Sequence, residues 1–328
     1  MDVMPQAAVT RYGSYAELPG AMLEDTMLLI ETDPGVLHGA WTASDGYAFA
    51  SVDGYGGDPC WLNVVGPPET SAALIEAALG ELGGRCCGMT VPRGLDVAPW
   101  LRFGSGGGDG TGAGAGTGGG DGTGNGSGAG TGSGDGTGNG DGDGDGDGDE
   151  AAAEAAAGTG AEVGAVAADG LLEPSQWDAM RCDAPPPVQP GEERVRPIED
   201  LAALQEFLDR VNPHHSVRAD HPEVERWLGA RDAVSGELLA VGAFTRRRRG
   251  TAYLASIATA EAARGQGLGA AVTAALTRHA FTSGDTVCTL AHYHPNEPAR
   301  RIYLRLGYRT THQSQSVQFG RRREAGCP

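Results

Sequence analysis

The sequence contains no lysine, so every permanently basic side chain is an arginine. A phosphate-binding loop of the P-loop class requires a Gly-Lys-Ser/Thr step, and this class of nucleotide site is therefore excluded. With alanine and glycine both abundant, the missing lysine indicates codon bias rather than a chemical requirement.

Long apolar runs and paired cysteine motifs are also missing. No stretch of eighteen or more apolar residues occurs, which predicts that nothing spans a membrane. Residues 1–20 lack a basic segment followed by an apolar run, so no signal peptide is expected. The six cysteines show no CxxC spacing, which favours reduced thiols in a cytoplasmic protein over a disulfide framework or a metal site.

Charge is distributed unevenly along the chain. From Glu192 onward arginines outnumber acidic residues by four, whereas the remaining residues carry an excess of 23 acids. A mildly basic second half suits a polyanionic ligand, although the excess is small. No basic stripe interleaved with aromatic residues is present, so nucleic-acid binding is not expected. The sequence gives no indication of an oligomeric state.

Residues 104–169 are almost devoid of large apolar side chains and are rich in Gly and Asp. Such a tract cannot bury enough surface to offset the entropy of ordering its backbone, which predicts a disordered linker insertion with at most a short helix over Ala151–Ala157.

Two calcium-site interpretations of this tract compete with a solvated linker. Asn139, Asp141, Asp143, Gly144 and Glu150 follow EF-hand spacing, but the first position is Asn and no helix precedes it. The GGDGTG segments resemble β-roll repeats without the apolar residue that packs each turn. Matches of this kind arise easily in a Gly/Asp repeat, so the solvated linker is favoured and no metal is expected.

Periodicity on either side of this linker indicates two α/β domains. The first is assigned to residues 1–103 plus 170–190 and the second to residues 192–328. The elements expected in the first domain are strands over Gly46–Val52, Cys60–Val65, Cys87–Val91 and Gln176–Cys182 and a helix over Ser71–Leu82.

The second domain repeats a similar order. Its expected elements are strands over Glu193–Arg196, Arg226–Asp232, Leu238–Thr245, Ala252–Thr259 and Thr286–His292, and a helix that Asp200 caps.

A glycine-rich turn follows the strand over Ala252–Thr259. Such a turn at a helix N-terminus directs several backbone N–H groups, and the positive end of the helix dipole, at one anion. Glycine at these positions permits positive φ and close approach of a phosphate. The Rossmann pattern fails because Val272 stands where the third glycine belongs. The residues expected to bind pyrophosphate are Arg264, Gly265, Gln266, Gly267, Leu268, Gly269 and Ala270.

A second motif comes after the next strand, with the spacing Asn296, Ala299, Tyr303, Gly307 and Tyr308. In this order and at this distance, the two motifs resemble those of the GNAT N-acetyltransferase superfamily over residues 192 to about 320. The resemblance implies an α/β (α+β) fold, in which helices flank a mixed central sheet whose fourth and fifth strands splay apart.

The resemblance also implies roles for individual residues. Backbone groups of Ile257, Ala258 and Thr259 would pair with the pantetheine arm of acetyl-CoA. Asn296 would contact the same arm, and Tyr303 would protonate the departing thiolate, which a phenol near the sulfur can do.

The implied function is transfer of an acetyl group from acetyl-CoA to a primary amine of a small molecule or a protein, without a metal. The alternative is a non-catalytic acyl-CoA-binding sensor or scaffold of the same fold. The strand over Ala252–Thr259 holds no carboxylate to act as general base. His292 and His294 could relay a proton, could simply be satisfied or face solvent, or ordered water could serve instead.

The first domain carries Gly66-Pro67-Pro68-Glu69 at the position equivalent to the glycine-rich turn. The two prolines remove two N–H donors, and the glutamate adds negative charge where pyrophosphate would lie. The domain resembles the degenerate half of a tandem GNAT protein, and the alternative is a supporting α/β domain of similar order.

Overall fold

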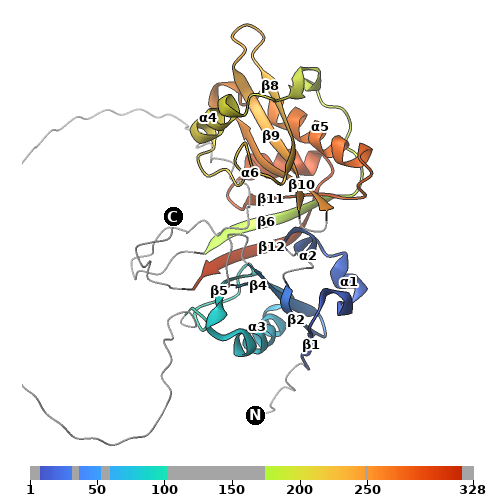
Figure 1. Cartoon of the computed structure of the whole chain (residues 1–328), viewed down its shortest axis with the longest axis vertical. Coiled ribbons are helices and arrows are strands. Elements are labelled where there is room, and N and C mark those ends of the chain that lie inside the picture. The colour runs from blue at the N-terminus through green and yellow to red at the C-terminus, as the bar shows by residue number, and fades with distance from the viewer. Residues whose placement is uncertain (1–7, 32–36, 53–59, 102–173, 248–249, 320–328) are drawn as a thin grey trace, which may run out of the picture. The chain divides into compact units, whose positions relative to one another are not determined.

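The computed structural model describes residues 8–31, 37–52, 60–101, 174–247 and 250–319 (Figure 1). The linker expected over residues 104–169, both calcium-site interpretations and the short helix over Ala151–Ala157 lie outside these residues.

The first half follows the order expected from its periodicity. Helix α3 begins at Pro68 rather than Ser71, because proline is tolerated in the first turn of a helix, where its missing N–H costs no hydrogen bond. The elements are β1 (Thr10–Tyr12), α1 (Gly20–Leu23), α2 (Thr26–Glu31), β2 (Leu37–Ala43), β3 (Gly46–Val52), β4 (Cys60–Val65), α3 (Pro68–Leu82), β5 (Cys86–Pro92) and β6 (Ser175–Cys182).

The second half repeats the β-β-β-α-β order. The strand expected over Glu193–Arg196 is shorter, because Glu192–Arg194 forms a 3₁₀ turn. Asp200 caps α4 as expected, with its Oδ1 accepting the Ala203 N–H at 3.0 Å. The elements are β7 (Val195–Pro197), α4 (Leu201–Val211), β8 (Val224–Arg231), β9 (Leu238–Arg247), β10 (Thr251–Thr259), α5 (Leu268–Thr282), β11 (Cys288–Tyr293), α6 (Glu297–Arg305) and β12 (Arg309–Gln318).

The strands of both halves form one mixed sheet in the order β1-β2-β3-β4-β5-β12-β6-β11-β10-β9-β8-β7. Within it, β4 runs parallel to β5 and β10 runs parallel to β11, and helices lie against its faces (Figure 1). The α/β architecture predicted from the sequence, a mixed sheet flanked by helices, is confirmed. Among the helices that the structure describes, none is long and apolar enough to cross a membrane.

The two halves exchange a strand at the centre of this sheet. β6, which follows the first half along the chain, lies between β11 and β12, and β12, at the end of the second half, lies between β5 and β6 (Figure 1). The sequence assigns residues 170–190 to the first domain, and the strand expected there is present, but its ladder partners both come from the second half. Because of this exchange, hydrogen-bonded ladders run without a break from β5 through β12 and β6 to β11, and they join the two halves in one sheet.

Alternation along each strand divides the core between the two faces of the sheet. In the second half, α5 and α6 pack on one face with Met180, Leu254 and Leu290, whereas α4 packs on the other with Tyr253 and Ala255. In the first half, α3 covers its face with a separate cluster built on β3, β4 and β5. The residues of the proposed second-half site are carried by β10, α5, β11 and α6.

Candidate active site

β10 carries a bulge at Ser256, where φ is +47° and the register with β9 shifts between Ala255 and Ala258. The extra residue reverses the alternation of the strand, so that Ile257 joins Leu254 on the face covered by α5 and α6. The Ser256 hydroxyl is fully buried and turns toward the segment after α4, where it accepts the Val217 N–H at 3.1 Å. A serine hydroxyl therefore stabilises a backbone conformation that L residues rarely adopt.

Beyond this bulge β10 separates from its parallel neighbour. The register between β10 and β11 pairs Ala252 with Cys288 and Tyr253 with Thr289, and within the described ladder it extends no further. Ala258 and Thr259 remain paired with β9 through Val241 and Ala240. The opposite backbone edge of β10 from Leu254 onward is thus not engaged by β11. This is the edge on which the resemblance places pantetheine, next to Ile257, Ala258 and Thr259.

The glycine-rich turn leads directly into α5. Gly265 and Gly267 have φ of +76° and +78°, and no other atom lies within 4 Å of the Cβ that each would carry. The first hydrogen bond of α5 runs from the Ala271 N–H to the Gly267 carbonyl at 3.0 Å. The N–H groups of Leu268, Gly269 and Ala270 therefore precede the intrahelical ladder and point out of the helix end.

Gly269 is constrained for a different reason from the other two turn glycines. Its φ is not positive, and an added Cβ would approach Thr259 Oγ1 to 3.1 Å. The expectation that glycine permits positive φ thus applies to Gly265 and Gly267, whereas Gly269 lets α5 lie close to the end of β10. Arg264 and Gln266 are exposed at the same turn.

Asn296 occupies the N-cap of α6. Its Oδ1 accepts the Ala299 N–H at 3.2 Å, which fixes the amide and orients the helix start. The side chain is 2% exposed, and its Nδ2 makes no hydrogen bond among the described residues. A buried amide donor without an acceptor is costly, so the position suits a ligand that supplies a carbonyl oxygen.

Tyr303 lies about two turns further along α6 and is buried. Its ring centroid is 5.9 Å from that of His292 and 6.0 Å from that of Tyr308. The Tyr308 hydroxyl is engaged with Thr277 Oγ1 at 2.7 Å and Cys288 Sγ at 3.3 Å, and burial raises the pKa of Tyr308 well above its ordinary value. Tyr303 therefore lies between a structural tyrosine and a histidine at the end of β11.

His292 is fully buried and its hydrogen bond determines its tautomer. Nδ1 lies 2.8 Å from the Tyr293 carbonyl, which can only accept, so Nδ1 carries the proton and Nε2 holds a lone pair. Nε2 has no partner among the described residues. Burial lowers the pKa of His292, against the opposing influence of the Tyr293 carbonyl and the Asp178 carboxylate, and so favours the neutral ring.

His294 has the opposite arrangement. Its Nδ1 lies 2.6 Å from Arg93 Nη1, and because a guanidinium can only donate, this Nδ1 must accept and Nε2 must carry the proton. Arg93 also forms an ion pair with Asp178, whose side chain is fully buried and whose Oδ1 lies 3.8 Å from His294 Nδ1. The two histidines that the sequence left equivalent therefore differ.

Sequence reasoning missed Arg93 and Asp178, because both come from the part of the chain assigned to the first domain. Asp178 faces His292 directly across the β6–β11 ladder. The signal that could have found it is a single carboxylate in the middle of the strand Ser175–Cys182, where the neighbouring side chains Trp177, Ala179 and Met180 are apolar and buried.

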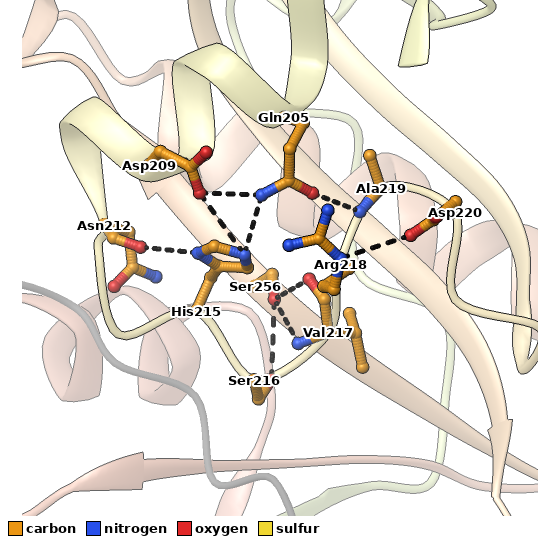
Figure 2. A network of polar contacts seen from close by, with 10 residues as sticks. All are labelled: Gln205, Asp209, Asn212, His215, Ser216, Val217, Arg218, Ala219, Asp220 and Ser256. Carbon is orange, nitrogen blue, oxygen red and sulfur yellow. Dashed lines mark hydrogen bonds and ion pairs between the residues drawn. The ribbon is translucent and has the colours of Figure 1, made fainter. Parts of the chain in front are cut away.

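The segment after α4 is tied to the bulge of β10 by a polar network (Figure 2). His215 Nδ1 lies 3.0 Å from the Asn212 carbonyl, and Gln205 Nε2 lies 3.1 Å from His215 Nε2. The Gln205 Oε1 accepts the Ala219 N–H at 2.9 Å, and Ser256 holds Val217 at the centre of the segment. Most of these polar groups satisfy one another, so the network fixes the segment's shape rather than offering an open ligand set.

Groups of three or more His, Cys, Asp or Glu side chains placed to hold a metal ion do not occur within the described residues. The acyl-CoA implied by the two motifs fits this region better, since an orphaned buried amide at Asn296 and free N–H groups at the start of α5 both call for a ligand with carbonyl and phosphate oxygens.

Residues 189–308 match the model of the acetyltransferase (GNAT) family. No curated protein matches the sequence.

Solved structures with a similar fold were also found. A GCN5-related N-acetyltransferase from Sphaerobacter thermophilus is 13% identical over 89% of this chain and 83% of its own, with a TM-score of 0.44. One from Kribbella flavida is 14% identical over 86% and 90%, with a TM-score of 0.42. A tandem GNAT protein from the clavulanic acid biosynthesis pathway is 11% identical over 94% and 91%, with a TM-score of 0.38.

Because the similarity scores to these structures are low, the family assignment depends on the sequence match. That match contains the glycine-rich turn, the Asn296 cap and Tyr303. Residues 189–308 are thus similar to the acetyltransferase (GNAT) family, a similarity that indicates acyl-CoA-dependent acyl transfer.

Proposed function

We propose that the second half of this chain transfers an acetyl group from acetyl-CoA to a primary amine of a small molecule or a protein. The observation that carries the proposal is the separation of β10 from β11 directly before a glycine-rich helix start. An unpaired strand edge and a cluster of free N–H groups can bind an extended amide-containing arm and a pyrophosphate at its end.

In this proposal each expected residue has a role that its surroundings permit. The backbone from Ile257 to Thr259 pairs with the pantetheine arm, and the turn from Arg264 to Ala270 holds the pyrophosphate. Asn296 offers its Nδ2 to a carbonyl of the arm. Tyr303 donates a proton to the thiolate as the carbon–sulfur bond breaks.

The acceptor is proposed to enter near the segment over residues 212–221, which the Ser256 bulge holds beside β10. The first part of the chain is strongly acidic, and this favours a cationic amine over an anionic one. Strands β1 to β6 of that part lie in the same sheet as the strands of the proposed site.

The alternative is a sensor or scaffold that binds acyl-CoA without turning it over. The absence of a carboxylate on β10 is the observation in its favour. A buried neutral histidine with a free lone pair beside Tyr303 favours the enzyme, because it supplies the proton acceptor that the strand lacks.

Thiol release from acetyl-CoA, measured with a panel of polyamines, aminoglycosides and peptides with free N-termini, tests the proposal. Replacing Tyr303→Phe should lower kcat by roughly 10²-fold while leaving acetyl-CoA affinity unchanged, because the phenol acts only as the thiolate forms. Tyr308→Phe is the matched control, since that hydroxyl is engaged with Thr277 and Cys288. Binding without turnover by the unaltered protein across the panel would favour the sensor.

A further inference from the structure

Three buried polar atoms near the end of β11 have no hydrogen-bond partner within the described part of the chain. They are His292 Nε2, Asn296 Nδ2 and Asp178 Oδ2. The Asn296 Nδ2 donor is expected to contact the cofactor arm. The lone pair of His292 Nε2 and the Asp178 Oδ2 oxygen remain, and neither motif of the sequence explains their use. Both belong to residues that face each other across the β6–β11 ladder.

Residues directly opposite in an antiparallel ladder have Cβ atoms about 5 Å apart and project from the same face of the sheet. Asp178 and His292 are such a pair, and Met180 and Leu290 on the same strands pack with Tyr303 on the face covered by α6. The lone pair of His292, the free oxygen of Asp178 and the ring of Tyr303 therefore share one face of the sheet.

We propose, on the basis of the acyl-transfer function above, that His292 is the base that takes the proton from the acceptor amine. Asp178, which the exchanged strand β6 brings from the other half of the chain, is the positioning residue that supplies the counter-charge to the imidazolium. His294 is kept out of this role by Arg93, which forces it into the donor tautomer.

The step balances without a further reactant. The amine nitrogen attacks the thioester carbonyl, and its N–H proton passes to His292 Nε2 as the carbon–nitrogen bond forms. The carbon–sulfur bond breaks, and the thiolate takes the proton of Tyr303. The protonated His292 then returns a proton to the phenolate, whose ring centroid lies 5.9 Å away, so both residues recover their starting forms.

The charges around His292 are consistent with a base that is neutral at rest. Asp178 on β6 and Glu297 on α6 favour the imidazolium, whereas Arg300 on α6 opposes it. Glu297 and Arg300 lie 3.6 Å apart and largely offset each other. Asp178 shares Oδ1 with Arg93 but keeps Oδ2 free, so it remains the buried anionic group opposite the ring.

The first test is the pH dependence of kcat/KM with acetyl-CoA and the best amine of the panel. His292→Gln should lower the rate about 100-fold or more and abolish the acidic limb of the profile. His294→Gln, the matched control, should retain that limb and lose less than about tenfold, because His294 is not the base. Asp178→Asn should move the limb to lower pH, since the carboxylate raises the pKa of His292.

The second test does not depend on turnover or on the stability of a variant. In the full chain labelled with ¹⁵N-histidine, His292 should give the chemical shifts of the Nδ1–H tautomer and His294 those of the Nε2–H tautomer. An Nε2–H proton on His292, or unchanged rates and pH profile in His292→Gln, overturns the proposal. If turnover persists in that variant, the acetyltransferase function stands and only the base assignment falls. If no amine is acetylated, both fall.

Discussion

The two halves of the sheet have the same order of elements, but their parallel strand pairs, β4 with β5 and β10 with β11, differ in how far they stay paired. In the second half the register of β10 and β11 covers Ala252 and Tyr253, although β10 continues to Thr259. In the first half β4 is paired with β5 from Cys60 to Asn63, close to its end at Val65, with one register shift between Cys60 and Trp61. The register of β4 with β3 is continuous, whereas β10 bulges at Ser256.

Side chains reinforce this difference. The indole of Trp61 occupies the space beside Gly88 on β5 and donates to Thr90 Oγ1 at 2.9 Å. In the turn after β4, the Gly66 carbonyl is occupied by a hydrogen bond from within the protein, because the Ser71 hydroxyl donates to it at 3.0 Å. In the second half a bulge turns β10 away from its parallel neighbour, whereas in the first half a large side chain packs between β4 and β5. Topology alone therefore does not make a cofactor site.

The largest expected difference between the halves is in cofactor binding. We predict one acetyl-CoA site per chain by isothermal titration. Gly267→Glu should weaken binding at least about 100-fold, because it places a carboxylate among the N–H donors and each charge-assisted hydrogen bond contributes about 1.5–3 kcal/mol.

Glu69→Gln in the first half is the control and should change nothing, since we expect no pyrophosphate there. An added Cβ at Gly267 meets no other atom within 4 Å, but its φ of +78° is one that L residues rarely adopt, so the variant should fold with a melting temperature lowered by the strain of roughly 1–2 kcal/mol. A second binding event, or loss of affinity in Glu69→Gln, would contradict the contrast between the halves.

The closed pair of the first half should resist any added volume. Gly88→Ala is expected to lower the free energy of unfolding by about 1–3 kcal/mol, because the new Cβ would meet the Trp61 indole and approach the Val317 carbonyl to 2.7 Å. Gly84→Ala, where the added Cβ has no neighbour within 4 Å, should be nearly neutral. Equal denaturation midpoints for the two variants would show that β4 and β5 are not tightly packed.

A smaller effect is expected from the bulge in the second half. Ser256→Ala removes the hydroxyl that accepts the Val217 N–H, which should cost about 1 kcal/mol of stability and raise KM for the amine more than KM for acetyl-CoA. Ser216→Ala removes only a 3.4 Å contact to the same hydroxyl and serves as the control. Unchanged kinetics in Ser256→Ala would separate the bulge from the acceptor segment.

The smallest expected effect is on stability at acidic pH. The folded-state pKa of His292 is lowered by burial, while the unfolded value is about 6.5. The unfolded chain therefore takes up this proton first, so the contribution is fully present above pH of about 6.5 and is lost as pH falls through the folded-state pKa. His292→Gln should flatten this part of the stability profile, and an unchanged slope would assign it to other groups.

Much of the fold could be predicted from local pattern. The strands over Gly46–Val52 and Cys60–Val65 have the bounds that periodicity indicated, and the glycine-rich turn stands at the start of α5. Such features depend on side chains a few residues apart, where alternation and capping act directly. The helix cap at Asp200 belongs to the same group.

The exchange of β6 and β12 could not be predicted in this way. Alternation determines which face of a strand is buried, but it does not determine which of two similar edges that strand joins. For the same reason the sequence could name His292 and His294 as possible proton relays but could not distinguish them. Arg93 and His294 are 201 positions apart, and the contact that sets the His294 tautomer exists only in the folded sheet. The two histidines are equivalent in the sequence, and long-range packing gives them different tautomers.

The strand exchange also has an evolutionary consequence. A first half that we expect to bind no cofactor cannot be discarded, because it carries the strand that separates β11 from β12 and the carboxylate opposite His292. Deleting it would leave the edge of β11 bare and open to pairing with other chains. Each half thus contributes a strand that the other half needs, β6 in one direction and β12 in the other. Selection on the second half alone is therefore enough to preserve both.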